Sequence, residues 1–333
     1  MTRKPTESLA DGYVKWVRSK VGSQLIYLAY AGVVIFDNQG RILVQERYDF
    51  DWLSTPGGAM ELGESLLETA RREVREETGL EADIKGLVGV YSHPRFNLLY
   101  PNGDRVQQWT ACFWGTVGGG ELQPDGGETL KLHFMAPEEV LKRTHISHEY
   151  FIRDALRVRL GGPPHMEEPY SAPALTPYYP ILREHVGHDP VILPGTLAVI
   201  EDEQGRILMV RRADTGQWDF PAGFADLGES TTANIIREVR EETGLDVEPT
   251  GIIGLYSAPR WFYGTHINGD VTQGVGVGFA CRVTGGALDA QGHDDESTAV
   301  AYLSLAQIMA ECSDTVRDIL RDYADRDNWP HIR

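Results

Sequence analysis

The sequence predicts an α/β protein built from two similar domains, each with a mixed β-sheet and helices. Blocks of identical residues recur at an offset of 165 positions, from Val21-Gly22 and Val186-Gly187 to Pro94-Arg95 and Pro259-Arg260. Within each copy, strand-like apolar runs precede and follow a segment of helical periodicity, which is typical of a sheet covered by helices. A chain of 333 residues is also long enough for two domains.

Each copy is expected to contain the same elements in the same order. The predicted strands are apolar runs bounded by turn residues: Ala31–Phe36, Ile42–Gln45, one ending at Tyr91 and Gln107–Val117, and in the second copy Thr196–Ile200, Ile207–Val210, one ending at Tyr256 and Gly274–Val283. A helix is expected over Ser65–Thr78, because apolar residues follow a helical stripe and Gly79 stops it. A Gly-rich turn, a short strand and an amphipathic helix close each copy.

The segment between the copies is rich in proline. Gly161 to Pro180 reads GGPPHMEEPYSAPALTPYYP, which disfavours both a helix interior and a central strand. We therefore expect an extended linker at 161–175, a first domain at 1–160 and a second domain at 176–333.

Composition limits the classes of partner. The net charge of −18 argues against binding to long nucleic acid, and the 41% apolar content suits two soluble cores. The longest apolar run, Leu25–Phe36, is too short to span a bilayer, and the first residues lack the apolar core of a signal peptide, so we expect a cytoplasmic protein without a membrane partner. Cys112 and Cys281 fall in apolar runs and are expected to be buried, inert thiols.

Two stretches with one spacing carry the chemistry, and we call Gly58–Leu80 the first box and Gly223–Leu245 the second box. In the first box, Glu73, Glu76 and Glu77 stand at i, i+3 and i+4, so their carboxylates share one face of the helix. Such a cluster of hard oxygen ligands repels itself until a divalent cation binds, which indicates a Mg²⁺ or Mn²⁺ site. A solvated acidic helix is the alternative, and the exact recurrence of the spacing in both copies disfavours it.

Both boxes resemble the Nudix box of the Nudix hydrolases, with every defining position filled. The resemblance implies an α/β/α sandwich in each half and cleavage of a pyrophosphate bond in a nucleoside diphosphate linked to another group, NDP-X. It implies metal ligation by Glu73, Glu76 and Glu77 with the Gly57 carbonyl, and in the second copy by Glu238, Glu241, Glu242 and Ala222. Glu76 and Glu241 also count as catalytic residues, and the box residues expected to hold loop and helix together are Gly58, Glu64, Arg72, Gly223, Glu229 and Arg237.

Residues outside the boxes are open to two interpretations. Glu128 and Glu296 align before the last strand, where each is either a general base or a plain turn acid. Arg95-Phe96 and Arg260-Trp261 pair a guanidinium with an aromatic ring, which suits a phosphate and a base, or an aromatic cap on the core. Trp52 and Trp218 precede the boxes and are expected to pack as a lid over the core.

The resulting hypothesis is a tandem Nudix hydrolase that converts NDP-X to NMP and phospho-X at two metal sites. Release of pyrophosphate from a (d)NTP is the nearest alternative, and a nucleotide-sensing module without turnover is the alternative of another class. Arg72–Leu80 and Arg237–Leu245 are identical, which favours two competent sites. Two fused copies are also expected to pair as a pseudo-dimer within one chain.

Overall fold

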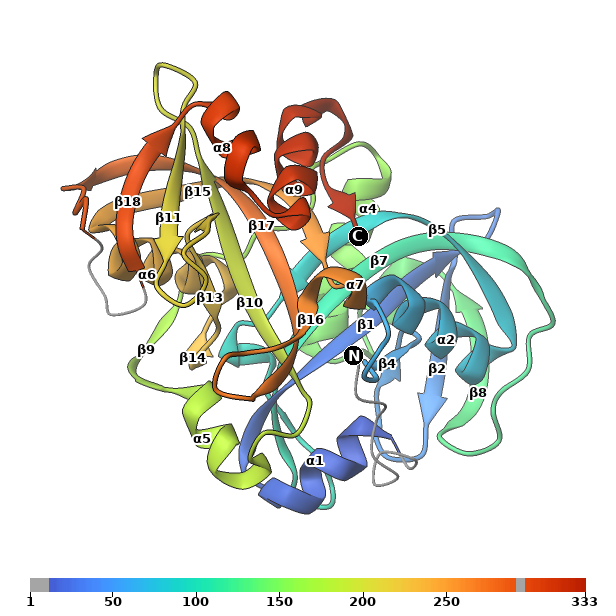
Figure 1. Cartoon of the computed structure of the whole chain (residues 1–333). Helices are drawn as coiled ribbons and strands as arrows, with labels where there is room; N and C mark the ends of the chain where they lie inside the picture. The colour runs from blue at the N-terminus through green and yellow to red at the C-terminus, as the bar shows by residue number, and fades with distance from the viewer. Residues whose placement is uncertain (1–11, 292–296) are drawn as a thin grey trace. The chain divides into compact units, whose positions relative to one another are not determined.

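The computed structural model describes residues 12–291 and 297–333, and the chain divides into two compact units. Met1–His165 with Glu184–Val186 is assigned to unit 1, and Met166–Arg183 with Gly187–Arg333 to unit 2 (Figure 1). Each unit combines helices with a mixed sheet, so the predicted α/β class with two domains is confirmed.

The elements of unit 1 are α1 (Tyr13–Val21), β1 (Leu25–Phe36), β2 (Ile42–Arg47), β3 (Leu53–Ser54), β4 (Gly57–Ala59), α2 (Leu66–Thr78), β5 (Leu80–Tyr91), η2 (Pro94–Phe96), β6 (Leu98–Leu99), β7 (Arg105–Gly120), β8 (Thr129–Met135), α3 (Pro137–Val140) and α4 (Ile146–Arg159).

The sheet of unit 1 is mixed and has the strand order β3-β2-β1-β7-β5. β1 and β7 run parallel along the whole of β1, whereas β5 pairs antiparallel with β7 and β4 antiparallel with β1. β1 is buried on both faces over most of its length, which explains its continuous apolar run. Because Gly57 of β4 pairs with Gly32 of β1, the start of the first box lies at the centre of the sheet.

Helices cover both faces of this sheet. α2 packs on β1, β4 and β5 through Leu66, Ala70 and Val74, which are fully buried. On the other face, α4 contributes to a core cluster that includes Val34 and Phe36 of β1. Alternate residues of a strand face opposite sides, so the arrangement is the expected α/β/α sandwich.

The elements of unit 2 are β9 (Ser171–Thr176), α5 (Tyr178–Val186), β10 (Val191–Ile200), β11 (Ile207–Arg212), β12 (Trp218–Asp219), β13 (Ala222–Phe224), β14 (Leu227–Glu229), α6 (Thr231–Thr243), β15 (Leu245–Tyr256), α7 (Pro259–Phe262), β16 (Tyr263–Thr265), β17 (Val271–Gly286), β18 (Ser297–Leu303), α8 (Leu305–Glu311), α9 (Asp314–Ala324), η3 (Arg326–Asn328) and β19 (His331–Ile332).

Unit 2 repeats the central topology of unit 1. Its strand order β13-β10-β17-β15 corresponds to β4-β1-β7-β5, again with one parallel pair, β10 with β17. α6 packs on β10, β13 and β15 as α2 does on their counterparts, and α9 joins the core cluster on the other face. The counterparts of β2, β3 and β8 form a separate three-stranded sheet, β12-β11-β18.

Several strands are longer than the sequence indicated. β1 begins at Leu25 instead of Ala31 because its early residues pair in parallel with the start of β7. β7 continues through Gly120, although Gly118–Gly120 was expected to form a turn. The reason is that β5 begins immediately after the box helix, and Leu80 pairs with Gly120 there.

The proline-rich segment is more structured than a linker. β9 pairs antiparallel with β14, and α5 begins at Tyr178 with Pro180 in its first turn. A proline is tolerated there because the first N–H groups of a helix have no intrahelical acceptor. Residues 166–176 therefore form part of unit 2.

Each unit closes with a histidine that docks in parallel beside the strand following the box helix. The His165 N–H donates to the Val88 carbonyl at 2.7 Å, and His165 bridges Gly89 of β5. In unit 2, His331 of β19 pairs with Gly254 of β15 in the same way. Residues 161–165 are therefore the closing segment of unit 1.

Two further expectations concern the cysteines and a membrane-spanning segment. Cys112, Cys281 and Cys312 are free and buried, and burial raises the pKa of the Cys281 thiol to about 12. Within 12–291 and 297–333, no helix has both the length and the apolar character needed to cross a membrane.

Candidate metal-binding active sites

The helix of the first box is fixed at both ends by local sequence. The Ser65 side chain accepts from the Glu68 N–H while the Glu68 carboxylate accepts from the Ser65 N–H, which forms a capping box. Gly79 ends the helix in the left-handed conformation at φ 71°. The three glutamates in between are thereby held in the last two turns of α2.

Glu77 is the most buried carboxylate of the first box, with 6% of its surface exposed. It accepts hydrogen bonds from the Gly57 N–H at 2.8 Å and from Gln45 Nε2 at 3.2 Å. Burial raises the pKa of Glu77 to about 8 despite the opposing effect of the Gly57 N–H. A carboxylate in this setting is stabilised in its charged form by a nearby cation.

Gly58 leaves space for the carboxylate of Glu73. A Cβ at this position would lie 2.5 Å from Glu73 Oε2, well inside van der Waals contact. Burial also raises the pKa of Glu73, partly offset by the neighbouring Arg72 guanidinium. A glycine is therefore required here by the position of the glutamate rather than by backbone conformation.

Arg72 connects the loop and the helix of the first box. Its Nε lies 2.6 Å from Glu64 Oε1, and its Nη2 donates to the Ala59 carbonyl at 3.0 Å. Its Nη1 lies 2.6 Å from Glu73 Oε1 and 3.1 Å from Glu76 Oε2. One guanidinium thus neutralises part of the acidic cluster.

The carboxylates of the first box do not converge on one point. Within the described part of the chain, no three Asp, Glu, His or Cys side chains are arranged to hold a metal ion. Glu73 and Glu76 are instead paired with Arg72, and Glu77 is bonded to Gly57. Coordination of a cation by all three would require Glu76, whose side chain is 57% exposed, to rotate.

A cleft of about 820 Å³ opens beside the first box. This volume suits a small-molecule ligand the size of a nucleotide. Its lining includes the box residues Gly57, Gly58, Glu73 and Glu77, together with Gln45, Arg47, Phe50, Trp52, Ser54, Thr55, Tyr100, Glu128, His145 and His148.

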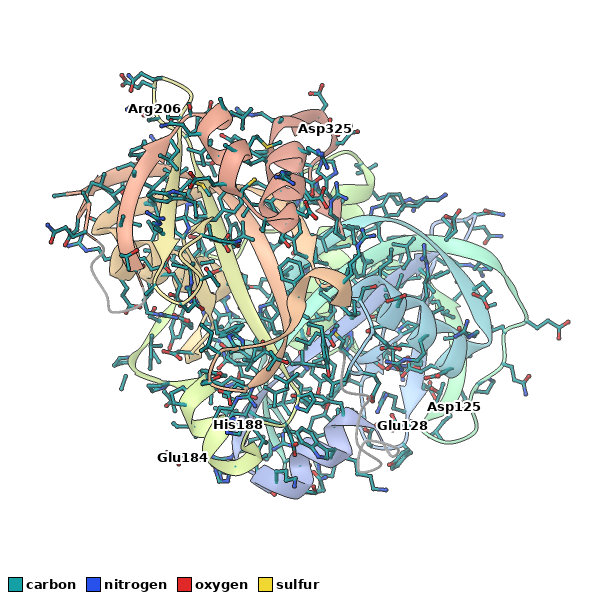
Figure 2. The ribbon with its side chains drawn as sticks, in the orientation of Figure 1. Asp125, Glu128, Glu184, His188, Arg206 and Asp325 are labelled. Atoms are coloured by element: carbon teal, nitrogen blue, oxygen red, sulfur yellow. The ribbon has the colours of Figure 1, made fainter. Side chains whose placement is uncertain are left out.

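Glu128 faces the same cleft from the turn before β8, where Figure 2 labels it beside Asp125. The Asp125 side chain accepts from the Gly127, Glu128 and Thr129 N–H groups, which fixes this turn. The Glu128 carboxylate is 59% exposed and lies 2.6 Å from Arg47 Nη2. The candidate base and the box carboxylates therefore line one cleft.

Comparison with known proteins identifies the family. The NUDIX domain family matches residues 27–155 and 192–323, which together make up more than half of the chain. The chain belongs to the Nudix family. It is therefore a Nudix hydrolase with two Nudix domains in tandem, and its enzyme class is that of hydrolases acting on acid anhydrides.

Two relatives and one solved structure that are similar to this chain each cover about 40% of it. A "MutT-like protein" of Streptomyces ambofaciens is 33% identical over 136 residues, which covers 40% of this chain and 78% of the relative. An "ADP-ribose pyrophosphatase" of Methanocaldococcus jannaschii is 32% identical over 135 residues, covering 40% and 75%. The crystal structure of an ADP-ribose pyrophosphatase from Streptococcus suis is 24% identical, covers 42% of this chain and 97% of that chain, and has a TM-score of 0.33.

The second Nudix box repeats the contacts of the first. The Ala222 N–H donates to Glu242 at 3.0 Å, as the Gly57 N–H does to Glu77. Arg237 contacts Glu229 at 2.7 Å and both Glu238 and Glu241 at 2.8 Å. Burial raises the pKa of Glu238 to about 7, and a Cβ on Gly223 would overlap its carboxylate.

The two Nudix boxes differ in what surrounds the start of the helix. β9 pairs with β14 in the second box, and Ser230 exchanges backbone and side-chain hydrogen bonds with Tyr170. The side chain of Glu229 is fully buried, whereas that of Glu64 is 21% exposed. Residues 166–176 of unit 2 therefore shield the loop of its Nudix box.

Two cleft residues beside Glu77 were missed by the sequence analysis. Gln45 and Arg47 lie on β2 and both donate to Glu77 Oε1, at 3.2 Å and 3.3 Å. Two signals in the sequence could have identified them. Gln45 and Arg47 alternate at the end of an apolar strand, and an arginine recurs at the equivalent position, 212. In unit 2, Arg212 lies 3.9 Å from Glu242, but Val210 stands in the place of Gln45.

The Arg95–Phe96 pair does not line the cleft of unit 1. Phe96 is 2% exposed and packs in the core, and Arg95 donates to the Tyr150 hydroxyl at 3.1 Å. Of the two interpretations, this arrangement is that of an aromatic cap on the core. Arg260 lines a separate hollow of about 340 Å³ beside α9. The Trp261 side chain and Glu296 fall outside what the structure describes.

Trp52 differs from its expected role as a lid over the core. Its ring is partly exposed and lines the cleft, stacked on Phe50 with centroids 4.2 Å apart. Trp218, by contrast, packs against the core cluster of unit 2.

Proposed function

We propose that this chain is a divalent-metal-dependent hydrolase that cleaves the pyrophosphate bond of an NDP-X substrate to NMP and phospho-X, with a site in each unit. The observation that supports this most directly is the cleft of unit 1, which places Glu73, Glu77 and Glu128 around a space of nucleotide size. The relative named an ADP-ribose pyrophosphatase has a substrate of this class.

The residues of the Nudix box suit Mg²⁺ or Mn²⁺. We assign the ligands Glu73, Glu76 and Glu77 with the Gly57 carbonyl, and Glu238, Glu241 and Glu242 with the Ala222 carbonyl. Hard carboxylate oxygens are the donors these ions prefer, and Gly58 makes room for one of them. Burial raises the pKa of Glu77, so a further cation beside this carboxylate would stabilise its charged form. When bound, a divalent cation neutralises phosphate charge and polarises the phosphoryl oxygen.

Glu128 is proposed as the general base of unit 1, and Glu296 as that of unit 2. Glu128 is exposed on the cleft wall, where it can accept a proton from water that attacks the diphosphate. One Glu128 carboxylate oxygen contacts Arg47 Nη2 at 2.6 Å, so this ion pair is expected to open when phosphate arrives. Arg47 also makes a bidentate ion pair with Asp49, and it is suited to receive that phosphate when these contacts open, because a guanidinium binds phosphate oxygens in a bidentate manner.

The decisive experiment is a Mg²⁺-supported turnover screen of the full chain across NDP-sugars, dinucleotides and (d)NTPs. NMP with phospho-X as products would support the proposal, and pyrophosphate release from a (d)NTP would replace it with the alternative reaction. The double variant Glu77→Gln, Glu242→Gln controls for contaminating hydrolases. Tight nucleotide binding without turnover in Mg²⁺ or Mn²⁺ would contradict catalysis.

A further inference from the structure

The cleft of unit 1 has a wall of aromatic rings that the reaction chemistry does not require. Phe50 and Trp52 are stacked at an interplanar angle of 21°, and the His145 ring lies 4.9 Å from Trp52 at 31°. Tyr100 extends the wall, 5.8 Å from Phe50. All four side chains are partly exposed and line the cleft, so a flat ligand can contact the wall where its rings remain exposed.

A histidine with a defined tautomer adjoins this wall. The Thr55 N–H and hydroxyl lie 3.3 Å and 3.0 Å from His148 Nδ1. Because a backbone N–H can only donate, Nδ1 is an acceptor and the proton of the neutral ring is on Nε2. Burial lowers the pKa of His148 to about 3, which keeps the ring neutral at physiological pH. His148 therefore presents an N–H donor in the cleft lining.

A buried hydroxyl in the same region lacks a partner. Ser54 on β3 is 4% exposed and lines the cleft, yet its Oγ has no hydrogen bond to any described residue. An unsatisfied buried polar group costs about 1–3 kcal/mol, so a ligand that satisfies it gains affinity. Ser54 precedes Thr55 in the chain and lines the same cleft as Trp52 and His148.

We propose that this part of the cleft is the nucleobase pocket of unit 1, in which the base stacks on the aromatic wall and Ser54 and His148 bind acceptors on its edge. The inference rests on the proposed function, because it assigns the base of the same NDP-X substrate. The diphosphate then lies toward Glu73 and Glu77 in the same cleft. Ser54 and His148 thereby determine which bases are accepted, since a base without an acceptor at that edge leaves both donors unpaired.

The test uses the full chain with Glu242→Gln, so that turnover reports unit 1. The substrates are ADP-, GDP-, CDP- and UDP-ribose, and a diribosyl diphosphate that lacks a base. Trp52→Leu is expected to raise KM for the preferred NDP-ribose about 10- to 100-fold, the range expected for loss of one base-stacking contact, with a smaller change in kcat. His148→Phe keeps a ring but removes the donor, and Ser54→Ala removes the hydroxyl; each is expected to raise KM about 5- to 10-fold and to change the ranking of bases.

The base-free substrate and two control variants show whether a rise in KM comes from lost contacts with the base. KM for the diribosyl diphosphate should change less than about 2-fold in each variant, because this substrate has no base to contact the replaced side chain. Trp218→Leu alters the corresponding tryptophan of unit 2, and His133→Phe alters an exposed histidine outside the cleft; neither should affect KM. Equal losses with and without a base, or no loss in either, would overturn the pocket. Ser54→Ala, which is nearly isosteric, carries the test if Trp52→Leu unfolds.

A separate binding measurement distinguishes this inference from the proposed function. Calorimetry compares the four nucleoside monophosphates with ribose 5-phosphate, without requiring turnover. Base-dependent binding lost in Trp52→Leu would support the pocket even if no substrate were hydrolysed. Hydrolysis with base-independent KM would instead retain the proposed function and reject the pocket.

Discussion

Replacing Gly58 with alanine tests whether Glu73 must occupy its observed position. The new Cβ would lie 2.5 Å from Glu73 Oε2, whereas ordinary contacts are about 3.5 Å, so the carboxylate must retreat by roughly 1 Å. The obstacle is the end of a flexible side chain, and the folding cost is expected to be only about 1 kcal/mol. A displacement of about 1 Å at a reacting centre can lower the rate about 10²-fold.

The assay measures turnover as a function of Mg²⁺ and Mn²⁺ concentration in a chain that also carries Glu242→Gln. Gly58→Ala is expected to raise the metal concentration for half-maximal activity and to lower kcat about 10²-fold. Gly119→Ala is the matched control, because a Cβ there meets no atom within 4 Å. Thermal unfolding of each variant separates loss of the ligand from loss of the fold.

An unchanged metal requirement in a folded Gly58→Ala protein would refute the reasoning. It would mean that Glu73 can leave its position without consequence and is not a ligand. Gly223→Ala repeats the experiment in unit 2, where the new Cβ overlaps the carboxylate of Glu238.

Four further predictions concern the two sites, the base, acid stability and the pairing of units. Glu77→Gln and Glu242→Gln should each remove turnover of a different subset of substrates in the panel, and only the double variant should be inactive on all; a variant with no effect on any substrate would make its unit a scaffold. Glu128→Gln and Glu296→Gln should each lower kcat of their own unit about 10²- to 10⁴-fold while metal affinity measured by titration stays nearly constant; an unaltered kcat would assign proton removal elsewhere. Lowering the pH from 7.5 to 5 should reduce the free energy of unfolding by about 2 kcal/mol through His148. The reason is that the pKa of His148 falls from 6.5 to about 3 on folding, so the unfolded chain binds the proton at a pH where the folded chain does not. Denaturant titrations of His148→Phe should lack this part of the loss. Fragments 1–165 and 166–333, expressed together, should associate on size exclusion as the expected pseudo-dimer, and two independent monomers would contradict it.

Much of the fold was predictable because its signals are local. The box helix lies where its apolar stripe and the Gly79 stop placed it, and β5 and β15 end at the expected tyrosines. Strand lengths were less predictable because they depend on a partner. Gly118–Gly120 favours a turn by composition, yet it continues β7 because β5 is already alongside.

The cleft was harder to predict than the box because its residues meet only after folding. Arg47 comes from β2, Trp52 from the loop before β3 and His148 from α4, with no shared spacing. Their roles depend on contacts such as that between Thr55 and His148, which are 93 positions apart. The acidic cluster, in contrast, lies on one helix and is visible as i, i+3 and i+4 spacing.

The closing histidines bear on how a tandem protein of this kind can arise. His165 closes unit 1 through an isolated parallel bridge to β5, and His331 closes unit 2 within β19 beside β15, so each copy carries its own closing segment. Joining two such units therefore requires only that the chain continue after the closing histidine of the first unit. The chain passes from the closing segment of unit 1 directly into unit 2, which begins at Met166. The residues after this junction form β9, which pairs with β14 and so adds to the second Nudix box a strand that the first box does not have.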